Sequence, residues 1–99
     1  MIAQFRVYRI AGQRLVLDLQ TDLIETGTRV VTPLLSVASG PSAIGRLEPV
    51  FEVDGMEHVL HTAEMAAIPS ALIEAPPVAD LSRFGHEIRG ALDMVFSDF

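Results

Sequence analysis

Residues 50–60 read VFEVDGMEHVL, and this stretch decides the class of the fold. The apolar residues of 50–53 predict one strand, and residues 57–62 predict the next. Asp54-Gly55 between them is the strongest turn signal in the chain, because a type I′ turn needs a positive φ at both central residues. The stretch therefore predicts a β-hairpin.

A second hairpin is predicted near the N-terminus. Residues 4–10 are rich in aromatic and β-branched side chains and predict a strand, and Gly12 lies in the short break that follows. Leucines then alternate with other residues over 15–20, and this period of two places the leucines on one face of a strand. The same alternation turns Asp18 and Gln20 toward water or a partner.

The remaining strands are marked by their prolines and glycines. Residues 29–35 predict a third strand, which lies at a sheet edge or ends at Pro33, because proline cannot donate to the ladder. Residues 36–46 are rich in Ser, Gly and Pro and predict a loop. Residues 72–73 predict a short last strand, after which Pro76-Pro77 interrupts the chain.

The C-terminal segment predicts a helix capped by Ser82 or Asp80. One apolar stripe runs along it at helical spacing. The stripe consists of Leu81, Phe84, Ile88, Ala91, Leu92, Val95 and Phe99. Strands followed by one helix indicate an α+β fold that is mostly antiparallel, with a small barrel-like sheet.

Composition narrows the class of protein. The 99 residues are 49% hydrophobic, which excludes disorder and predicts one domain, residues 1–99. The chain has no cysteine, and no signal peptide or membrane span is evident, so we expect a cytoplasmic protein without membrane contact. The net charge is −6, no lysine is present and the arginines are scattered. Direct nucleic-acid binding is therefore not expected, and a protein partner is.

Few residues suggest catalysis or metal binding. His58 and His61 are three apart in a predicted strand and point to opposite faces, so no shared metal site is expected. Asp18, Asp22 and Glu25 form an acidic group that is typical of a solvated turn or a protein-contact patch. A small enzyme that uses these carboxylates for acid–base chemistry is the alternative, although no nucleophile or oxyanion donor accompanies them. Cofactors are not expected, and a small interaction protein is favoured over an enzyme.

The end of the predicted helix leaves two interpretations open. Met94, Val95, Phe96 and Phe99 lie in its last turn, right at the chain end. These side chains either pack under the sheet, or project as an apolar anchor for a partner, since buried aromatics dominate interface energetics. Spacing alone favours packing under the sheet.

Several short runs in a fixed order resemble the CcdB toxins of plasmid and chromosomal toxin–antitoxin modules. The most informative runs are Gln4-Phe5-Arg6-Val7-Tyr8, Asp18-Leu19-Gln20-Thr21-Asp22-Leu23-Ile24, Arg29-Val30-Val31 with Pro33-Leu34, and Val78-Ala79-Asp80-Leu81-Ser82. The resemblance covers nearly the whole chain, and the length differences fall at residues 11–13 and 36–46, where loops tolerate insertions.

This resemblance implies a fold, a target and partners. The family fold is an SH3-like β-barrel with a C-terminal helix, active as a homodimer. It implies a toxin that is not an enzyme, that inserts into the dimeric cleft of DNA gyrase A and that traps the gyrase on cleaved DNA. A cognate CcdA-like antitoxin removes the toxin. It also supplies the DNA-binding domain through which the complex represses its own operon, so contact with DNA is indirect.

The resemblance also assigns site residues. The antitoxin-contact region corresponds to Asp22, Leu23 and Ile24 in a turn and to Asp93 and Phe96 on the helix. The gyrase-binding tail, which is Trp-Gly-Ile in the family, corresponds to Ser97, Asp98 and Phe99. All three tail positions depart from the family pattern. The alternative is therefore a homologue that dimerises and binds antitoxin but is non-toxic or directed at another target.

Overall fold

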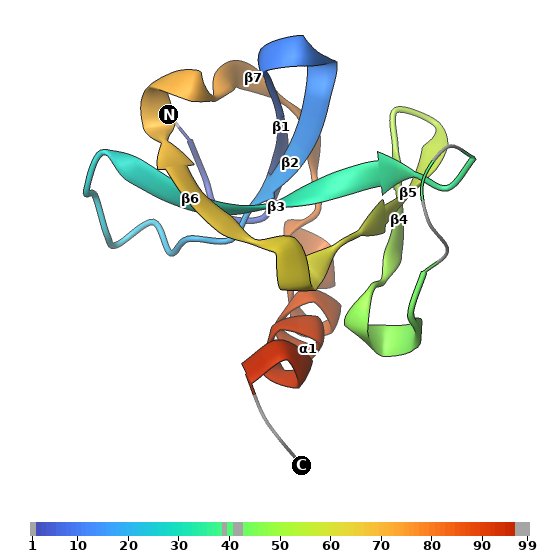
Figure 1. The fold of residues 1–99 in the computed structure, drawn as a ribbon. Helices are drawn as coiled ribbons and strands as arrows, with labels where there is room; N and C mark the ends of the chain where they lie inside the picture. The colour runs from blue at the N-terminus through green and yellow to red at the C-terminus, as the bar shows by residue number, and fades with distance from the viewer. Residues whose placement is uncertain (1, 39, 41–42, 97–99) are drawn as a thin grey trace.

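The computed structural model describes residues 2–38, 40 and 43–96, and Figure 1 shows its strands and helix in order along the chain. The strands are β1 (Arg6–Ile10), β2 (Arg14–Asp18), β3 (Thr28–Ser36), β4 (Val50–Val53), β5 (Met56–Leu60), β6 (Ala66–Pro69) and β7 (Glu74–Asp80). The helix α1 (Gly85–Phe96) follows them, so the expected order of strands and then one helix is confirmed.

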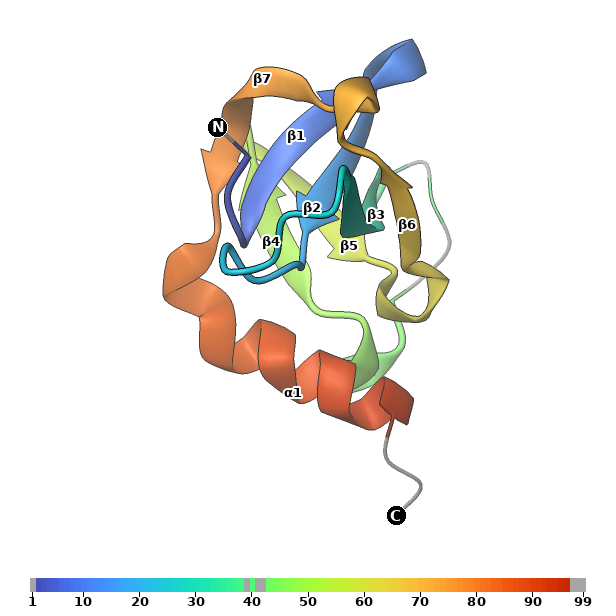
Figure 2. The same cartoon turned by 90° about the vertical axis from the view of Figure 1, so that its left-hand side faces the viewer.

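One curled antiparallel sheet forms the body of the protein. Its strands follow the order β4-β5-β3-β2-β1-β7, and β6 pairs with the first half of β3. Every strand pairing in the described part of the chain is antiparallel. Figure 2 shows the sheet wrapped around its core, with α1 lying beneath it. The fold is thus an α+β half-barrel with one C-terminal helix.

The main core lies between the concave face of the sheet and α1. The expected leucine face is confirmed, because Leu17 and Leu19 are buried in this core and Leu15 packs against it. The helix contributes Ile88, which is completely buried. Full burial of a side chain of this size stabilises a fold by about 1.5–3 kcal/mol. A smaller core cluster around Tyr8 and other apolar residues lies on the opposite face.

The predicted hairpin at residues 50–60 is confirmed. Asp54 and Gly55 have φ angles of 55° and 78°, which is the positive pair that a two-residue turn between β4 and β5 requires. The expected third strand extends further than predicted and is central rather than an edge strand. Pro33 lies between the part of β3 that pairs with β6, which ends at Val31, and the part that pairs with β5, which begins at Leu34. A residue without an N–H donor is tolerated at this break in the pairing.

The predictions for residues 72–77 were wrong. Leu72 lies in a short 3₁₀ turn, Ser70–Leu72, and the last strand is β7, which contains both Pro76 and Pro77. The prolines are accommodated because β7 is the edge strand beside β1 and its register shifts there. No helix in the described residues is long and apolar enough to cross a bilayer.

Candidate protein-binding surfaces

The loop between β2 and β3, residues 19–27, presents two apolar side chains to solvent. Leu23 is 94% exposed and Ile24 is 49% exposed. Figure 2 shows the loop at the front of the view, where it projects from the sheet. Neither side chain belongs to either core cluster of the described residues, so the loop has a surface suited to a protein partner.

A buried ion pair anchors this loop. The Arg29 guanidinium donates two hydrogen bonds to the Asp18 carboxylate, one of them from Nε to Oδ1 at 3.2 Å. The two side chains are only 4% and 0% exposed. Burial raises the pKa of Asp18 against the opposing effect of the Arg29 hydrogen bonds. The pKa of Arg29 is raised because Asp18 accepts its N–H groups.

Further polar contacts hold the loop in one shape. Arg29 Nη2 donates to the Gln20 carbonyl at 3.1 Å and lies 3.5 Å from Asp22 Oδ1. The Gln20 side chain spans the loop, because its Nε2 donates to the Ile24 carbonyl at 2.9 Å and its Oε1 accepts the Val30 N–H at 3.2 Å. The exposed positions of Leu23 and Ile24 are therefore fixed by specific hydrogen bonds.

These contacts correct the prediction for the acidic group. Asp18 does not face water or a partner, because its carboxylate is buried against Arg29. A carboxylate held in this way is closed to a substrate, so Asp18 cannot serve as an acid–base group of the kind that the enzyme alternative requires. Asp22 and Glu25 are exposed, as a protein-contact patch requires. Period two alone could not reveal a charged residue whose partner lies on the next strand.

The end of α1 forms a second apolar surface. Met94 is 44% exposed and Phe96 is 74% exposed, while Val95 is half-buried. The expectation that this last turn packs under the sheet was therefore wrong for Met94 and Phe96. Asp93 is exposed beside them. Ser97, Asp98 and Phe99 lie outside the described residues.

The two expected halves of the antitoxin-contact region are separate within one chain. No described hydrogen bond or ion pair joins the loop positions Asp22, Leu23 and Ile24 to Asp93 or Phe96. Figure 1 shows the β2–β3 loop at the side of the sheet and α1 below it. A partner that contacts both surfaces must therefore extend over the molecule.

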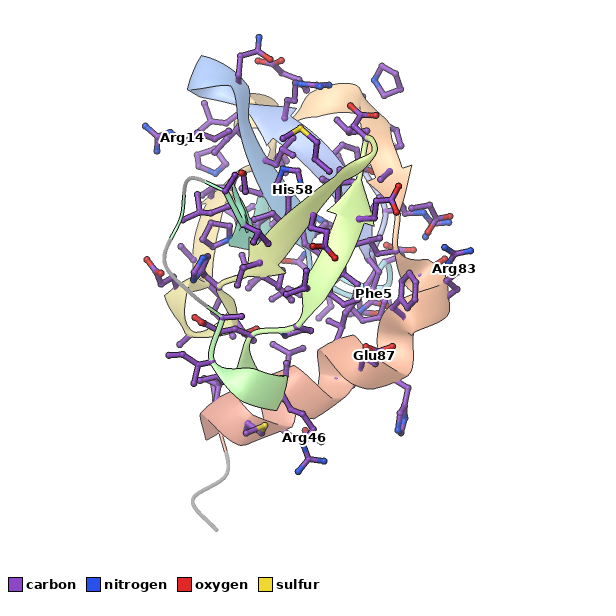
Figure 3. The ribbon with its side chains drawn as sticks, turned by 90° about the vertical axis from the view of Figure 1, so that its right-hand side faces the viewer. Phe5, Arg14, Arg46, His58, Arg83 and Glu87 are labelled. Carbon is purple, nitrogen blue, oxygen red and sulfur yellow. The ribbon has the colours of Figure 1, made fainter. Side chains whose placement is uncertain are left out.

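A groove alongside α1 was not foreseen from the sequence. It has a volume of about 540 Å³ and lies between the helix and the segment around Arg46 and Pro49. Glu87, Gly90 and Met94 line its helical side, and Figure 3 shows Arg46 and Glu87 at this side of the molecule. A Cβ added at Gly90 would meet no atom within 4 Å. An exposed glycine in mid-helix, which costs stability relative to alanine, was the available sequence signal.

The histidines take part in separate local contacts. His61 Nδ1 lies 3.0 Å from Glu48 Oε2, and both side chains are buried. Glu48 also accepts the Ile44 N–H at 3.1 Å and so ties the segment before β4 to the sheet. His58 Nδ1 lies 2.9 Å from the Met56 carbonyl oxygen. Within residues 2–38, 40 and 43–96, no group of three or more ligand-type side chains is arranged to hold a metal ion.

The fold is similar to two solved structures of toxin–antitoxin systems. One is described as an endoribonuclease in complex with its cognate antitoxin from Mycobacterial species, with a TM-score of 0.78 and 12% identity over 97% of this chain and 95% of that one. The other is MazE-MazF from Deinococcus radiodurans, with a TM-score of 0.74 and 18% identity over 99% and 97% of the two chains.

Sequence comparison identifies the family. No curated protein sequence matches the chain significantly. The family described as CcdB protein matches residues 4–98, which span both apolar surfaces and the strands between them. This match over almost the full length confirms the resemblance seen in the sequence, and the chain belongs to the CcdB family.

Proposed function

We propose that this protein is the toxin of a toxin–antitoxin module, that it acts by binding, and that a cognate antitoxin neutralises it. The observation that carries the proposal is the β2–β3 loop, in which Leu23 and Ile24 are exposed to solvent while a buried ion pair anchors the loop. A fixed apolar pair is preorganised for a partner, and preorganisation lowers the entropic cost of binding. Family membership supports the same assignment.

In this proposal the antitoxin is an extended, CcdA-like chain that covers the loop positions Asp22, Leu23 and Ile24 together with Asp93 and Phe96 on α1. Separation of the two surfaces favours a partner of that kind over a small globular one. DNA is bound by the antitoxin, and the complex regulates its own operon. The acidic, lysine-free composition of this chain agrees with that division of roles.

The proposed target is DNA gyrase A, bound by the tail Ser97, Asp98 and Phe99 of an SH3-like toxin. The support for gyrase is family membership together with the exposed Met94 and Phe96, which place an apolar surface directly before that tail. The departure of the tail from Trp-Gly-Ile favours a second candidate, a homologue that dimerises and binds antitoxin without poisoning gyrase.

Induced expression in a gyrase-sensitive bacterium tests the assignment. We expect growth arrest that is relieved by co-expression of the neighbouring small gene, and double-strand cleavage of plasmid DNA when purified toxin, gyrase and ATP are combined. Antitoxin binding without growth arrest or DNA cleavage would favour the second candidate. Cleavage of RNA by the purified protein alone would contradict the proposal, since it would make the protein an endoribonuclease.

The proposal includes a homodimer in which the α1 helices lie near the two-fold axis. Light scattering at micromolar concentration is expected to give a mass near twice 10.7 kDa, and a monomer would contradict it. Gly90→Arg tests whether the dimer interface lies at α1, because the open space around Gly90 lets the fold accept a side chain. The variant is expected to remain folded and become monomeric.

A further inference from the structure

We infer that the convex face of strands β3, β5 and β4 docks a segment of the antitoxin that carries both apolar and basic side chains. This inference rests on the proposed function and concerns a surface outside the β2–β3 loop and α1. We call this surface the β3–β5–β4 face and define it by Leu35, Val37, Val50, Glu52 and Glu57.

Strand register places an apolar row on this face. Leu35 pairs with Val59 and Val59 pairs with Val50, so the three side chains lie side by side across three strands. The alternate residues Leu34 and Leu60 point the other way into the main core. Leu35 and Val50 are exposed, and Val59 is buried between them. The row therefore lies on the face of the sheet opposite the main core, with exposed Leu35 and Val50 on either side of buried Val59.

The next row brings two like charges together. Glu52 and Glu57 are direct cross-strand partners in β4 and β5, and both are exposed. Like charges directly opposite each other destabilise an antiparallel pair. Exposed Val37 continues this row, since its N–H donates to the Glu57 carbonyl at 3.0 Å. The face thus combines apolar surface with a local excess of negative charge.

Within the part of the chain that the structure describes, these two carboxylates stand outside every ion pair. Among the described residues no ion pair includes Glu52 or Glu57, whereas Asp54 in the same hairpin lies 3.5 Å from Arg9. An Arg guanidinium presents several N–H donors in one plane and is suited to two adjacent carboxylates. A basic residue of a partner would therefore remove the repulsion that the free protein carries.

The position of the face suits a peptide. β4 is the edge strand of the sheet, so one side of the face is open, and Figure 3 shows β4 and β5 at the front of the molecule. A second copy of this chain fits poorly, because a two-fold contact would bring the glutamates of both copies together. A segment with alternating basic and apolar residues matches both rows, and the antitoxin is the partner that the proposed function supplies.

Calorimetry with the purified antitoxin tests the inference. We expect Glu52→Gln and Glu57→Gln together to weaken antitoxin binding by at least tenfold and to reduce its dependence on salt. The same pair of substitutions should raise the melting temperature of the free protein by a few degrees, because it removes the cross-strand repulsion. If the two glutamates acted only in folding, the double variant would not combine a more stable free protein with weaker antitoxin binding.

Glu74→Gln provides a matched control, since Glu74 is an exposed glutamate on β7, outside this face. The control removes one charge and is expected to leave antitoxin affinity unchanged. Equal affinity of the double variant and the unmodified protein would overturn the inference while leaving the proposed function intact. A change in particle mass without a change in antitoxin affinity would assign the face to a contact between copies and would also overturn it.

Absence of any complex between the unmodified toxin and the antitoxin would instead overturn the proposed function. The two failures are therefore distinguishable in the same titration. Amide hydrogen exchange of the complex shows where the antitoxin docks. Residues of β4 and β5 are expected to gain protection. Protection confined to the β2–β3 loop and α1 would contradict docking on this face.

Discussion

The β2–β3 loop and the end of α1 both present apolar side chains to solvent, but the protein holds them in different ways. The loop is fixed by polar contacts, with the Asp18–Arg29 pair buried beneath it and Gln20 spanning it. The helix is held by an apolar stripe in which Ile88 and Ala91 are buried. Phe96 then extends beyond the part of the helix that is packed.

The two kinds of contact predict different responses of the loop and the helix to substitution. Hydrogen bonds are directional, so the loop has one arrangement of Leu23 and Ile24, and loss of one buried partner leaves a polar group unsatisfied. Apolar contacts are non-directional and many, so the helix tolerates loss of any exposed group. The loop is therefore suited to specific recognition, and the helix to a broad contact.

The largest expected effect comes from removing the cation beneath the loop. Arg29→Ala leaves the Asp18 carboxylate buried without its partner, and breaking a buried pair in this way costs about 3–5 kcal/mol. Urea unfolding at neutral pH measures the loss. Arg14→Ala is the control, because Arg14 is exposed, and its change is expected to stay within about 0.5 kcal/mol.

A second variant separates charge from packing. Replacing both partners, with Asp18→Leu and Arg29→Met, removes the uncompensated charge and is expected to recover most of the stability. Equal losses for Arg29→Ala and Arg14→Ala would mean that the ion pair does not anchor the loop. The comparison of loop and helix would then lose its basis.

The next effect concerns binding at the loop. Ile24→Asp is expected to weaken antitoxin binding by about 2 kcal/mol or more, the scale of an apolar anchor at an interface. The side chain is half-exposed, so the fold should survive, and thermal melting of the free protein checks this. A large drop in the melting temperature would identify Ile24 as a residue needed for folding and would refute a role in binding alone.

The tail gives a smaller effect on gyrase. In the proposed complex with gyrase, Asp98 stands where the family tail has glycine, and its carboxylate has to be desolvated in the gyrase cleft. Restoring the family ending with Ser97→Trp, Asp98→Gly and Phe99→Ile is expected to strengthen binding at least tenfold, or about 1.4 kcal/mol. Calorimetry with a gyrase A fragment measures it. Equal binding by the natural tail would remove the main support for the retargeted homologue.

The helix and the hairpin could be predicted from the sequence because their signals are local. The period of the apolar stripe placed Ile88 and Ala91 in the core, and Asp54-Gly55 fixed the turn between β4 and β5. The candidate antitoxin residues at 22–24 came from family resemblance, and their exposure agrees with a binding role. The apolar stripe and the turn signal depend only on neighbouring residues in the chain and need no tertiary information.

The buried pair and the groove could not be predicted because they depend on contacts between distant segments. Asp18 alternates with leucines and so reads as an exposed strand residue, and only its pairing with Arg29 on the next strand explains its burial. Pro33 likewise reads as an edge residue, because the change of neighbour from β6 to β5 is not visible in the sequence. Tertiary context overrode the local pattern at both sites.

The smallest expected effect lies at an exposed hydrogen bond just before the helical segment. The N-cap of the 3₁₀ turn Ser82–Phe84 is Leu81, which makes no side-chain cap hydrogen bond, so the expectation of a cap at Ser82 or Asp80 was wrong. Asp80 instead holds the chain just before this turn, because its Oδ1 accepts the Ser82 N–H at 2.8 Å. The hydrogen bonds from Ser82 keep the pKa of Asp80 below its ordinary value of 3.8. A lowered pKa in the folded protein means that the carboxylate stabilises the fold above pH 3.8 and loses this effect as pH falls through its folded-state pKa.

Two substitutions separate the hydrogen bond of Asp80 from its charge. Asp80→Ala should cost about 1 kcal/mol or less at neutral pH, and less in acid. Asp80→Asn keeps a hydrogen-bond acceptor, so it should lose only the part of the stability that depends on pH. Urea unfolding at neutral and acidic pH separates the two contributions, and a pH-independent gap between Asp80→Asn and the unmodified protein would show that the charge of Asp80 has no part in holding the helix start.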